Sequence, residues 1–167
     1  MKTFTDTEAE APPEVAGAAP AADTPVVEER SPASQIREKA EARARSGANW
    51  FFWIAAMSII NSITTLAGSD LGFIVGLGIT QLFDAAGAEF GAQAVTFVLS
   101  LLAAGGFVFF GVFARKQMGW AYVTGMILYA LDGLLFLAVG DILSVGFHAF
   151  VLFFMFNGYR ANKALQN

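Results

Sequence analysis

The chain has 167 residues, of which 56% are hydrophobic and 14% are charged, whereas about a quarter of the residues in an ordinary soluble domain are charged. Of its 10 basic and 14 acidic residues, 15 lie in residues 1–48, which leaves nine charges for the remaining 119 residues. Nine charges cannot cover the surface of a soluble domain of that size, and cysteine is absent. A soluble enzyme, a basic nucleic-acid-binding protein and a disulfide-stabilised secreted domain are therefore excluded, which leaves an all-α membrane protein.

Residues 1–33 form a polar tail that contains all five prolines of the chain together with seven acidic residues. A stretch of this composition cannot bury enough apolar area to offset the entropy of ordering it. We therefore predict a disordered N-terminal tail. Two interpretations of this tail stay open: an acidic docking segment, or a solvated leader without a partner.

Residues 34–48 are rich in helix formers and carry four bases against two acids. Ser34 can cap the start of this helix and Gly47 can end it. The pattern predicts a basic amphipathic juxtamembrane helix near anionic lipid headgroups, where each base contributes about 1 kcal/mol of attraction. The alternative is a signal for membrane orientation without a specific partner.

Four segments are long and apolar enough to cross about 30 Å of hydrocarbon, which takes about 20 helical residues. A fifth apolar segment, 71–83, has only 13 residues before Asp84, so it would cover roughly 20 Å and is more typical of a re-entrant half-helix. The expected fold is thus a bundle of four transmembrane helices plus one half-helix, followed by a C-terminal tail at 161–167. The four spans are 50–67, 92–113, 119–139 and 142–158.

The basic residues near the spans indicate how the bundle lies in the membrane. If 71–83 enters and leaves on one side, the bases before Trp50, at 115–116 and at 160–163 all lie on the cytoplasmic side. Because bases favour the cytoplasmic side of a membrane, this arrangement is preferred over five full crossings. We expect both termini to be cytoplasmic.

Glycines recur at intervals of four residues at Gly68, Gly72 and Gly76. Small residues at this spacing let a neighbouring helix approach closely. We expect them to pack the half-helix against the bundle, with homodimerisation as the alternative.

Asp132 and His148 are the only ionisable acid and base well inside the predicted spans. Each lies eight residues from Gly140, the centre of the last turn, so an antiparallel hairpin places both at the same depth. An aspartate at mid-membrane costs about 2.5–3.5 kcal/mol, a cost that pairing with His148 would reduce. Three further residues are predicted to reach the same layer and complete a polar site, namely Asn61, Tyr129 and Ser100. Two roles stay open for this site: a structural bond between the helices, or a proton relay.

Gln81, Asp84 and Glu89 form a second candidate site at the end of the half-helix. Gln81 and Asp84 are three residues apart and share a helical face. They are predicted to line an outward-facing vestibule with Glu89, which would attract cations. The alternative is a hydrated helix end at the interface.

Several kinds of chemistry lack the residues that they need. One histidine and no cysteine exclude Cys-based and multi-His zinc sites, and no nucleotide-binding or serine-hydrolase motif occurs. We expect no metal, no cofactor, no catalytic residues and no nucleic-acid partner. The expected partners are the lipid bilayer, its anionic lipids at residues 34–48, and another membrane protein or a second copy of the chain.

Four stretches carry a resemblance: NWFFWIAAMSIINSI (49–63), GLGITQLFD (76–84), GMILYALDGLLFL (125–137) and SVGFHAFVLFFMFNGY (144–159). They resemble a group of small bacterial multi-pass integral membrane proteins that have no assigned function. The resemblance implies a location in the bacterial inner membrane and supplies no activity or substrate. We expect a non-enzymatic accessory or assembly component, with a small proton-linked channel or transporter that uses the Asp132–His148 pair as the alternative.

Overall fold

The computed structural model describes residues 31–68 and 76–167 of the chain, and within these ranges it consists of helices and turns without a strand. The predicted tail up to residue 30, Gly72 and part of the predicted half-helix (71–75) lie outside the described residues. The five helices are α1 (Pro32–Leu66), α2 (Gly78–Phe90), α3 (Gln93–Arg115), α4 (Gly119–Ala138) and α5 (Ile142–Ala164).

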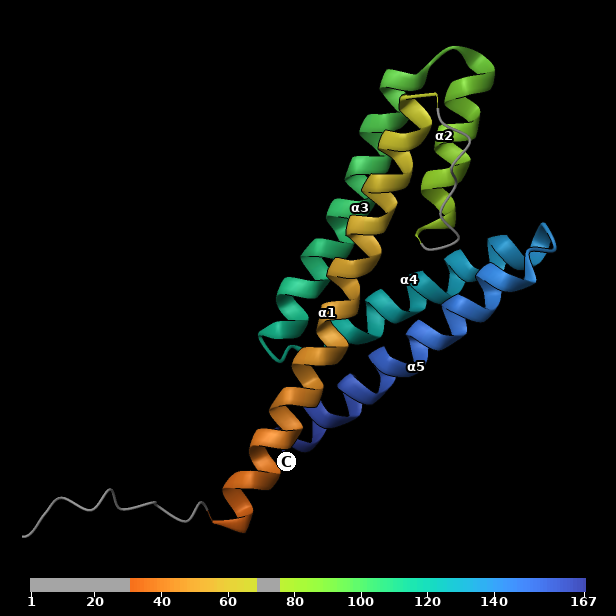
Figure 1. The fold of residues 1–167 in the computed structure, drawn as a ribbon. Helices are drawn as coiled ribbons and strands as arrows, with labels where there is room; N and C mark the ends of the chain where they lie inside the picture. Colours follow the sequence, from red (N-terminus) through yellow and green to blue (C-terminus); the bar gives the residue numbers. More distant parts are fainter. Residues whose placement is uncertain (1–30, 69–75) are drawn as a thin grey trace, which may run out of the picture.

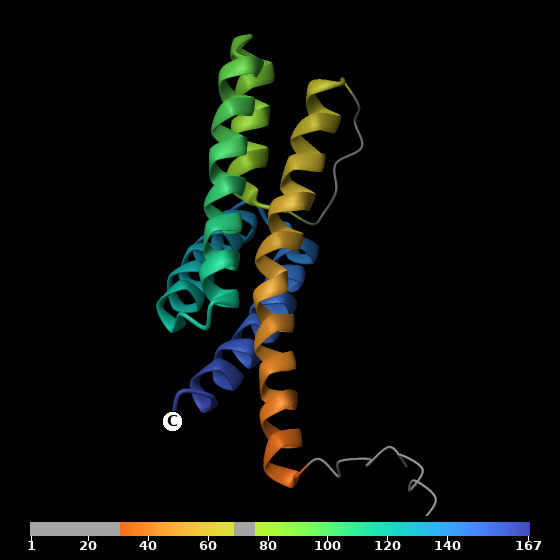
Figure 2. The same cartoon turned by 90° about the vertical axis from the view of Figure 1, so that its left-hand side faces the viewer.

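The helices form a bundle in two parts. α1, α2 and α3 run alongside one another, and the α4–α5 hairpin leans across them at an angle (Figure 1). The short helix α2 occupies only the half of the bundle that contains the C-terminal end of α1 (Figure 2). The expectation of an all-helical bundle is thereby confirmed.

The prediction of a separate juxtamembrane helix at 34–48 was wrong, because α1 is one continuous helix of 35 residues. It begins two residues before Ser34, and the side chain of Ser31 accepts the N–H of Ser34 at 3.3 Å. It also runs through Gly47, which was expected to end it. A glycine inside a helix costs about 1 kcal/mol, but this one lies where α1 and α5 touch backbone to backbone.

The half-helix was predicted at 71–83, whereas the structure has it at Gly78–Phe90. Asp84 was taken as its polar end, yet it is buried in the middle of the helix. The helix ends instead at Gly91, whose positive φ of 66° suits a glycine. The short length was predicted correctly, but the position is shifted toward the C-terminus.

Within the described residues, α3, α4 and α5 are long and apolar enough to cross a membrane. They correspond to three of the four predicted spans, although α5 continues to Ala164, beyond the predicted end at 158 and into the predicted tail. α1 is not among these helices because polar residues lower the mean hydropathy of its C-terminal half. These residues are Ser58, Asn61, Ser62, Thr64 and Thr65.

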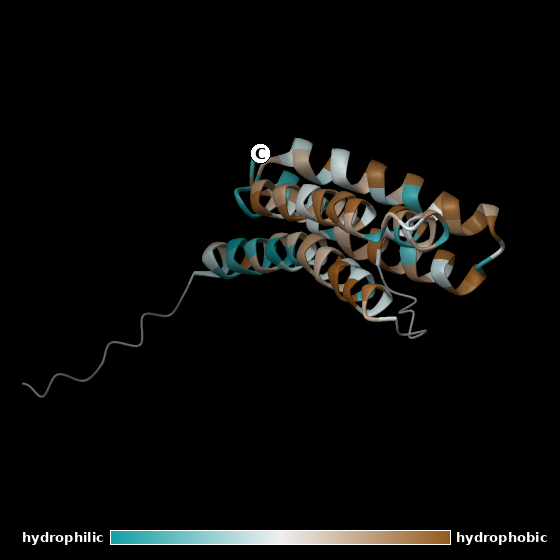
Figure 3. Ribbon diagram, turned by 90° about the horizontal axis from the view of Figure 1, so that it is seen from above, coloured by the Kyte–Doolittle hydropathy of each residue, from teal (hydrophilic) through white to brown (hydrophobic). Residues whose placement is uncertain are grey.

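Large apolar side chains cover much of the outside of α3, α4 and α5, for example Leu102 at 67%, Leu131 at 55% and Phe153 at 62% exposure. Hydrophilic residues gather on the N-terminal half of α1 and toward the C-terminus (Figure 3). The interior contains fully buried aromatic residues, among them Phe51, Tyr122 and Tyr129. This reversal of the usual polar exterior is what a bilayer requires.

The predicted glycine contacts differ from those that occur. Gly68 lies in the turn after α1, and among the described residues nothing lies within 4 Å of an added Cβ. Gly76 approaches α1, where an added Cβ would lie 2.9 Å from Nδ2 of Asn61. Gly68 and Gly76 lie outside the helices, so their spacing does not give them a shared helical face.

The close helix crossings use other glycines. A Cβ on Gly47 would lie 2.6 Å from Cα of Gly158, which joins α1 to α5. A Cβ on Gly87 of α2 would overlap the Thr96 hydroxyl of α3, and one on Gly125 of α4 would overlap the Phe51 ring of α1. At these glycines neighbouring helices approach one another closely, because a side chain would not fit.

Candidate functional site

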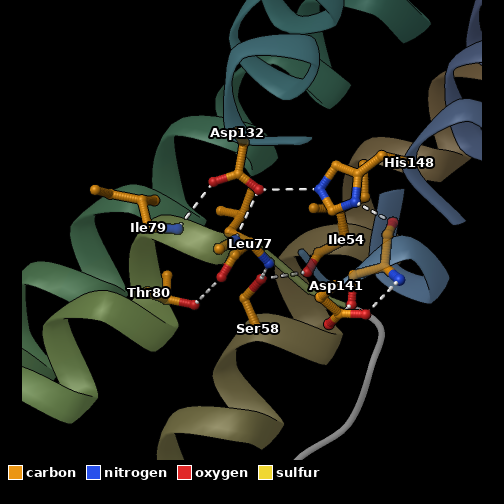
Figure 4. Close-up of polar contacts among 10 residues, drawn as sticks. Ile54, Ser58, Leu77, Ile79, Thr80, Asp132, Asp141 and His148 are labelled. Carbon is orange, nitrogen blue, oxygen red and sulfur yellow. Dashed lines mark hydrogen bonds and ion pairs between the residues drawn. The ribbon is translucent and has the colours of Figure 1, made fainter. Parts of the chain in front are cut away.

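Asp132 of α4 caps the first turn of α2. Its Oδ2 accepts the N–H of Gly78 at 2.7 Å and its Oδ1 accepts the N–H of Ile79 at 2.9 Å (Figure 4). The N-cap position of α2 is Leu77, whose side chain cannot accept these bonds. A carboxylate is also favoured at a helix N-terminus by the helix dipole. Asp132 therefore determines where α2 begins.

His148 of α5 holds the other side of this carboxylate. Its Nε2 lies 3.0 Å from Oδ2 of Asp132, and both side chains are almost fully buried. Its Nδ1 lies 2.8 Å from the carbonyl oxygen of Ser144. The structure thus brings together the two residues that the hairpin places at equal depth.

The hydrogen bonds of His148 define how many protons the pair holds. A carbonyl oxygen only accepts, so Nδ1 carries a hydrogen. The bond between Nε2 and Oδ2 then needs one further hydrogen, which resides on either His148 or Asp132. The pair is therefore an imidazolium with a carboxylate, or a neutral imidazole with a carboxylic acid.

Tyr129 contacts the imidazole with its ring rather than the carboxylate with its hydroxyl. The Tyr129 and His148 rings stack at 4.3 Å between centroids with planes 19° apart. Within the described residues the Tyr129 hydroxyl has no hydrogen-bond partner. Tyr129 therefore belongs to the predicted site through its ring, which packs against the imidazole of His148.

Ser58 of α1 contributes a contact that the sequence reasoning missed. Its hydroxyl accepts the N–H of Leu77 at 2.8 Å and donates to the carbonyl of Ile54 at the same distance (Figure 4). Three successive backbone N–H groups, from Leu77 to Ile79, are thus satisfied by α1 and α4. Asn61 is buried on the same helix, beside Gly76.

Ser100 does not join Asp132 as predicted but forms a separate cluster around Asp84 of α2. The hydroxyl of Ser62 donates to Oδ2 of Asp84 at 2.7 Å, and that of Ser100 donates to Oδ1 at 3.1 Å. The prediction compared only the depth of each residue along its span. It did not include the packing of α2 directly against α3, which brings Ser100 to Asp84. Asp84 therefore ties three helices together.

Of the three residues predicted to form the vestibule, Asp84 lines a cavity that the other two do not reach. A cavity of about 280 Å³ lies between α1, α2 and α3, and its polar lining is Ser62, Thr65, Asp84, Gln93 and Thr96. Gln81 and Glu89 do not line it, and Glu89 is exposed. The three are separated because α2 continues through Asp84 and turns Glu89 outward.

A second hollow reaches Asp132 from the side of the bundle. This crevice of about 450 Å³ lies between α2, α3 and α4 and is apolar apart from Asp132. Its walls include Leu102, Gly106, Phe110 and Leu128. It is open at the outer face of helices long and apolar enough to cross a membrane.

Beyond Tyr129 the interior becomes apolar. Phe51, Val151 and Met155 are fully buried there, and the Tyr122 hydroxyl donates to the carbonyl of Ala44. The described residues contain no group of three or more His, Cys, Asp or Glu that could hold a metal ion.

No protein-family model, curated protein or solved structure matches the chain. The site is therefore interpreted from its geometry.

Proposed function

We propose that this chain is a non-enzymatic integral membrane protein of the bacterial inner membrane that serves as an accessory or assembly component. In this proposal α1, α3, α4 and α5 span the membrane and α2 is a re-entrant half-helix. Both termini lie in the cytoplasm, as the positive-inside rule favours for Arg115, Lys116 and Lys163. The Asp132–His148 pair then acts as the internal brace that holds α2 inside the bundle.

The observation that supports a bracing role is the full engagement of the Asp132 carboxylate. It accepts two backbone N–H groups of α2 and contacts Nε2 of His148. A carboxylate that moves protons must exchange partners, and each exchange here would release the first turn of α2.

A proton-flux assay in vesicles containing the purified protein tests this role. We expect background flux from the wild type, Asp132→Asn and His148→Ala, together with lower stability of both variants in detergent. Flux above that of empty vesicles in the wild type, lost in both variants, would instead establish transport.

A proton-linked channel or transporter is the second candidate, favoured by two observations. The Asp132–His148 pair shares one hydrogen, and a cavity beside Asp84 opens at the other end of α2. Asp84→Asn belongs in the same flux assay, since a transport route through the cavity requires it to lower flux as well.

The orientation has its own test. A protease added outside intact cells should leave residues 1–48 uncut, whereas the same protease should cut them after the cells are opened. Cleavage in intact cells would place the N-terminus outside.

An accessory role requires a surface for a membrane partner, and the crevice between α2, α3 and α4 is the surface that we propose. Small residues at its wall, such as Gly106, leave room for the side chains of another helix. A photo-crosslinking residue in place of Leu102 should give one discrete adduct in cells. The same residue in place of Phe153, equally exposed on α5, should not. Equal diffuse labelling at both positions would contradict a partner there.

A further inference from the structure

The helices α1 and α5 cross at a pair of glycines and separate beyond it. Gly47 and Gly158 touch backbone to backbone, which no other residue would allow. On one side of this crossing, the N-terminal half of α1 and the C-terminal end of α5 diverge (Figure 2). A cleft of about 780 Å³ lies between them, and both glycines line it.

The walls of this cleft carry three bases and no acid. Lys39 and Arg43 come from α1, and Arg160 comes from α5. Within the described part of the chain none of the three forms an ion pair, whereas Arg37 on the same helix pairs with Glu41 at 3.1 Å. Three like charges gathered at one cleft repel one another unless an anion lies between them.

The cleft also has an apolar side. Ile36, Ala40, Phe154 and Ala161 are among its lining residues, and Ile36 is 69% exposed. Phe154 continues into the aromatic cluster of α1 and α5, since its ring lies 5.6 Å from that of Trp50. An occupant of this cleft therefore meets cations at its mouth and an apolar wall that leads toward the spans.

The position of the cleft along the bundle matches the depth of lipid headgroups. Trp50 lies one turn beyond Gly47 on α1, and Tyr159 directly follows Gly158 on α5. Tryptophan and tyrosine mark the boundary between hydrocarbon and water in membrane proteins. The bases lie on the water side of these two residues, where phosphate groups are found.

We propose that the cleft between α1 and α5 binds one anionic phospholipid. Arg43 and Arg160 face its phosphate from two helices, Lys39 meets the rest of the headgroup, and an acyl chain follows the wall at Phe154. Guanidinium groups bind phosphate oxygens through two hydrogen bonds at once, which suits them to this role. The inference rests on the membrane placement in the proposed function, and it goes beyond general attraction of α1 to a charged surface by assigning one site.

The test is lipid retention by the purified full chain, measured by mass spectrometry of the intact protein in detergent. The probes are phosphatidylglycerol and phosphatidylcholine, and the variant is Arg43→Gln with Arg160→Gln. We expect the wild type to retain one phosphatidylglycerol in preference to phosphatidylcholine. The double variant should bind phosphatidylglycerol about 30-fold more weakly.

The matched control is Arg45→Gln with Lys163→Gln, which removes the same charge from the same two helices outside the cleft. It should retain phosphatidylglycerol as the wild type does. Equal retention of both lipids by the wild type, unchanged binding by Arg43→Gln with Arg160→Gln, or an equal loss in the control would each overturn the assigned site. None of these results depends on orientation or on proton flux, so they are distinguishable from failure of the proposed function.

Discussion

The carboxylate of Asp132 accepts the N–H of Gly78 at 2.7 Å, so a residue of α4 caps a helix that starts 54 positions earlier. An N-cap normally comes from the residue that precedes the helix. Here the chain enters α2 through Leu77 and relies on a distant side chain. The stability of α2 is therefore coupled to the α4–α5 hairpin, and this coupling can be measured.

Asp132→Ala should lower the free energy of unfolding by about 2–4 kcal/mol. The loss of an N-cap costs about 0.5–2 kcal/mol, and buried donors left unsatisfied cost about 1–3 kcal/mol each. Unfolding of the purified protein in mixed detergent micelles measures the change. Glu89→Gln on the exposed face of α2 is the control and should stay near the wild type.

His148→Ala should cost about 0.6–2 kcal/mol, and its effect should depend on Asp132. Combining it with Asp132→Asn should give a coupling energy of about 0.5–3 kcal/mol, since the two side chains share one hydrogen bond. Additive losses in this double-mutant cycle would show that the contact contributes nothing to stability.

The separation of the two polar clusters makes a contrasting prediction. Ser62→Ala and Ser100→Ala should be coupled, because both hydroxyls donate to Asp84. Ser100→Ala and His148→Ala share no hydrogen-bond partner, so their losses should add to within about 0.5 kcal/mol. Strong coupling between Ser100 and His148 would restore the single polar layer that was predicted from the sequence.

The crossing of α1 and α5 should not tolerate a side chain. Gly158→Ala should destabilise the protein by about 1–3 kcal/mol, because its Cβ would lie 2.6 Å from Cα of Gly47 and the helices must separate. Gly146→Ala in the same helix has nothing within 4 Å and should be neutral or gain up to about 1 kcal/mol. Thermal unfolding of the two variants side by side measures the difference.

Asp141 should make the start of α5 sensitive to acid. The Ser144 hydroxyl donates to its carboxylate at 2.6 Å and the Ser144 N–H does so at 3.1 Å, and these bonds lower the pKa of Asp141 below its ordinary 3.8. A carboxyl whose pKa is lower in the folded state stabilises that state when ionised. This contribution is present above about pH 3.8 and is lost as the pH falls through the lowered pKa.

Carbon NMR of the Asp141 carboxyl across pH measures this titration in the folded protein. In Ser144→Ala the pKa of Asp141 should move back up toward 3.8, because the hydroxyl bond is the largest cause of the shift. An unchanged titration in Ser144→Ala would contradict this assignment.

The sequence by itself determined the all-helical class, its apolar exterior and the meeting of Asp132 with His148. The last of these follows from local geometry, because two residues eight positions from Gly140 lie at the same depth in any antiparallel hairpin. Apolar segments of about 20 residues indicated the helices. Composition indicated the apolar exterior, since nine charges among 119 residues cannot cover the surface of a soluble domain.

Only the tertiary structure decided where α2 begins, why α1 continues through Gly47 and which acid Ser100 contacts. The start of α2 depends on backbone N–H groups, which every residue carries and no sequence pattern distinguishes. Gly47 packs inside α1 against Gly158, 111 positions later, where a Cβ would lie 2.6 Å from the Cα of Gly158. Ser100 contacts Asp84 because α2 packs against α3, and contacts between distant segments of this kind leave no periodic signal in the chain.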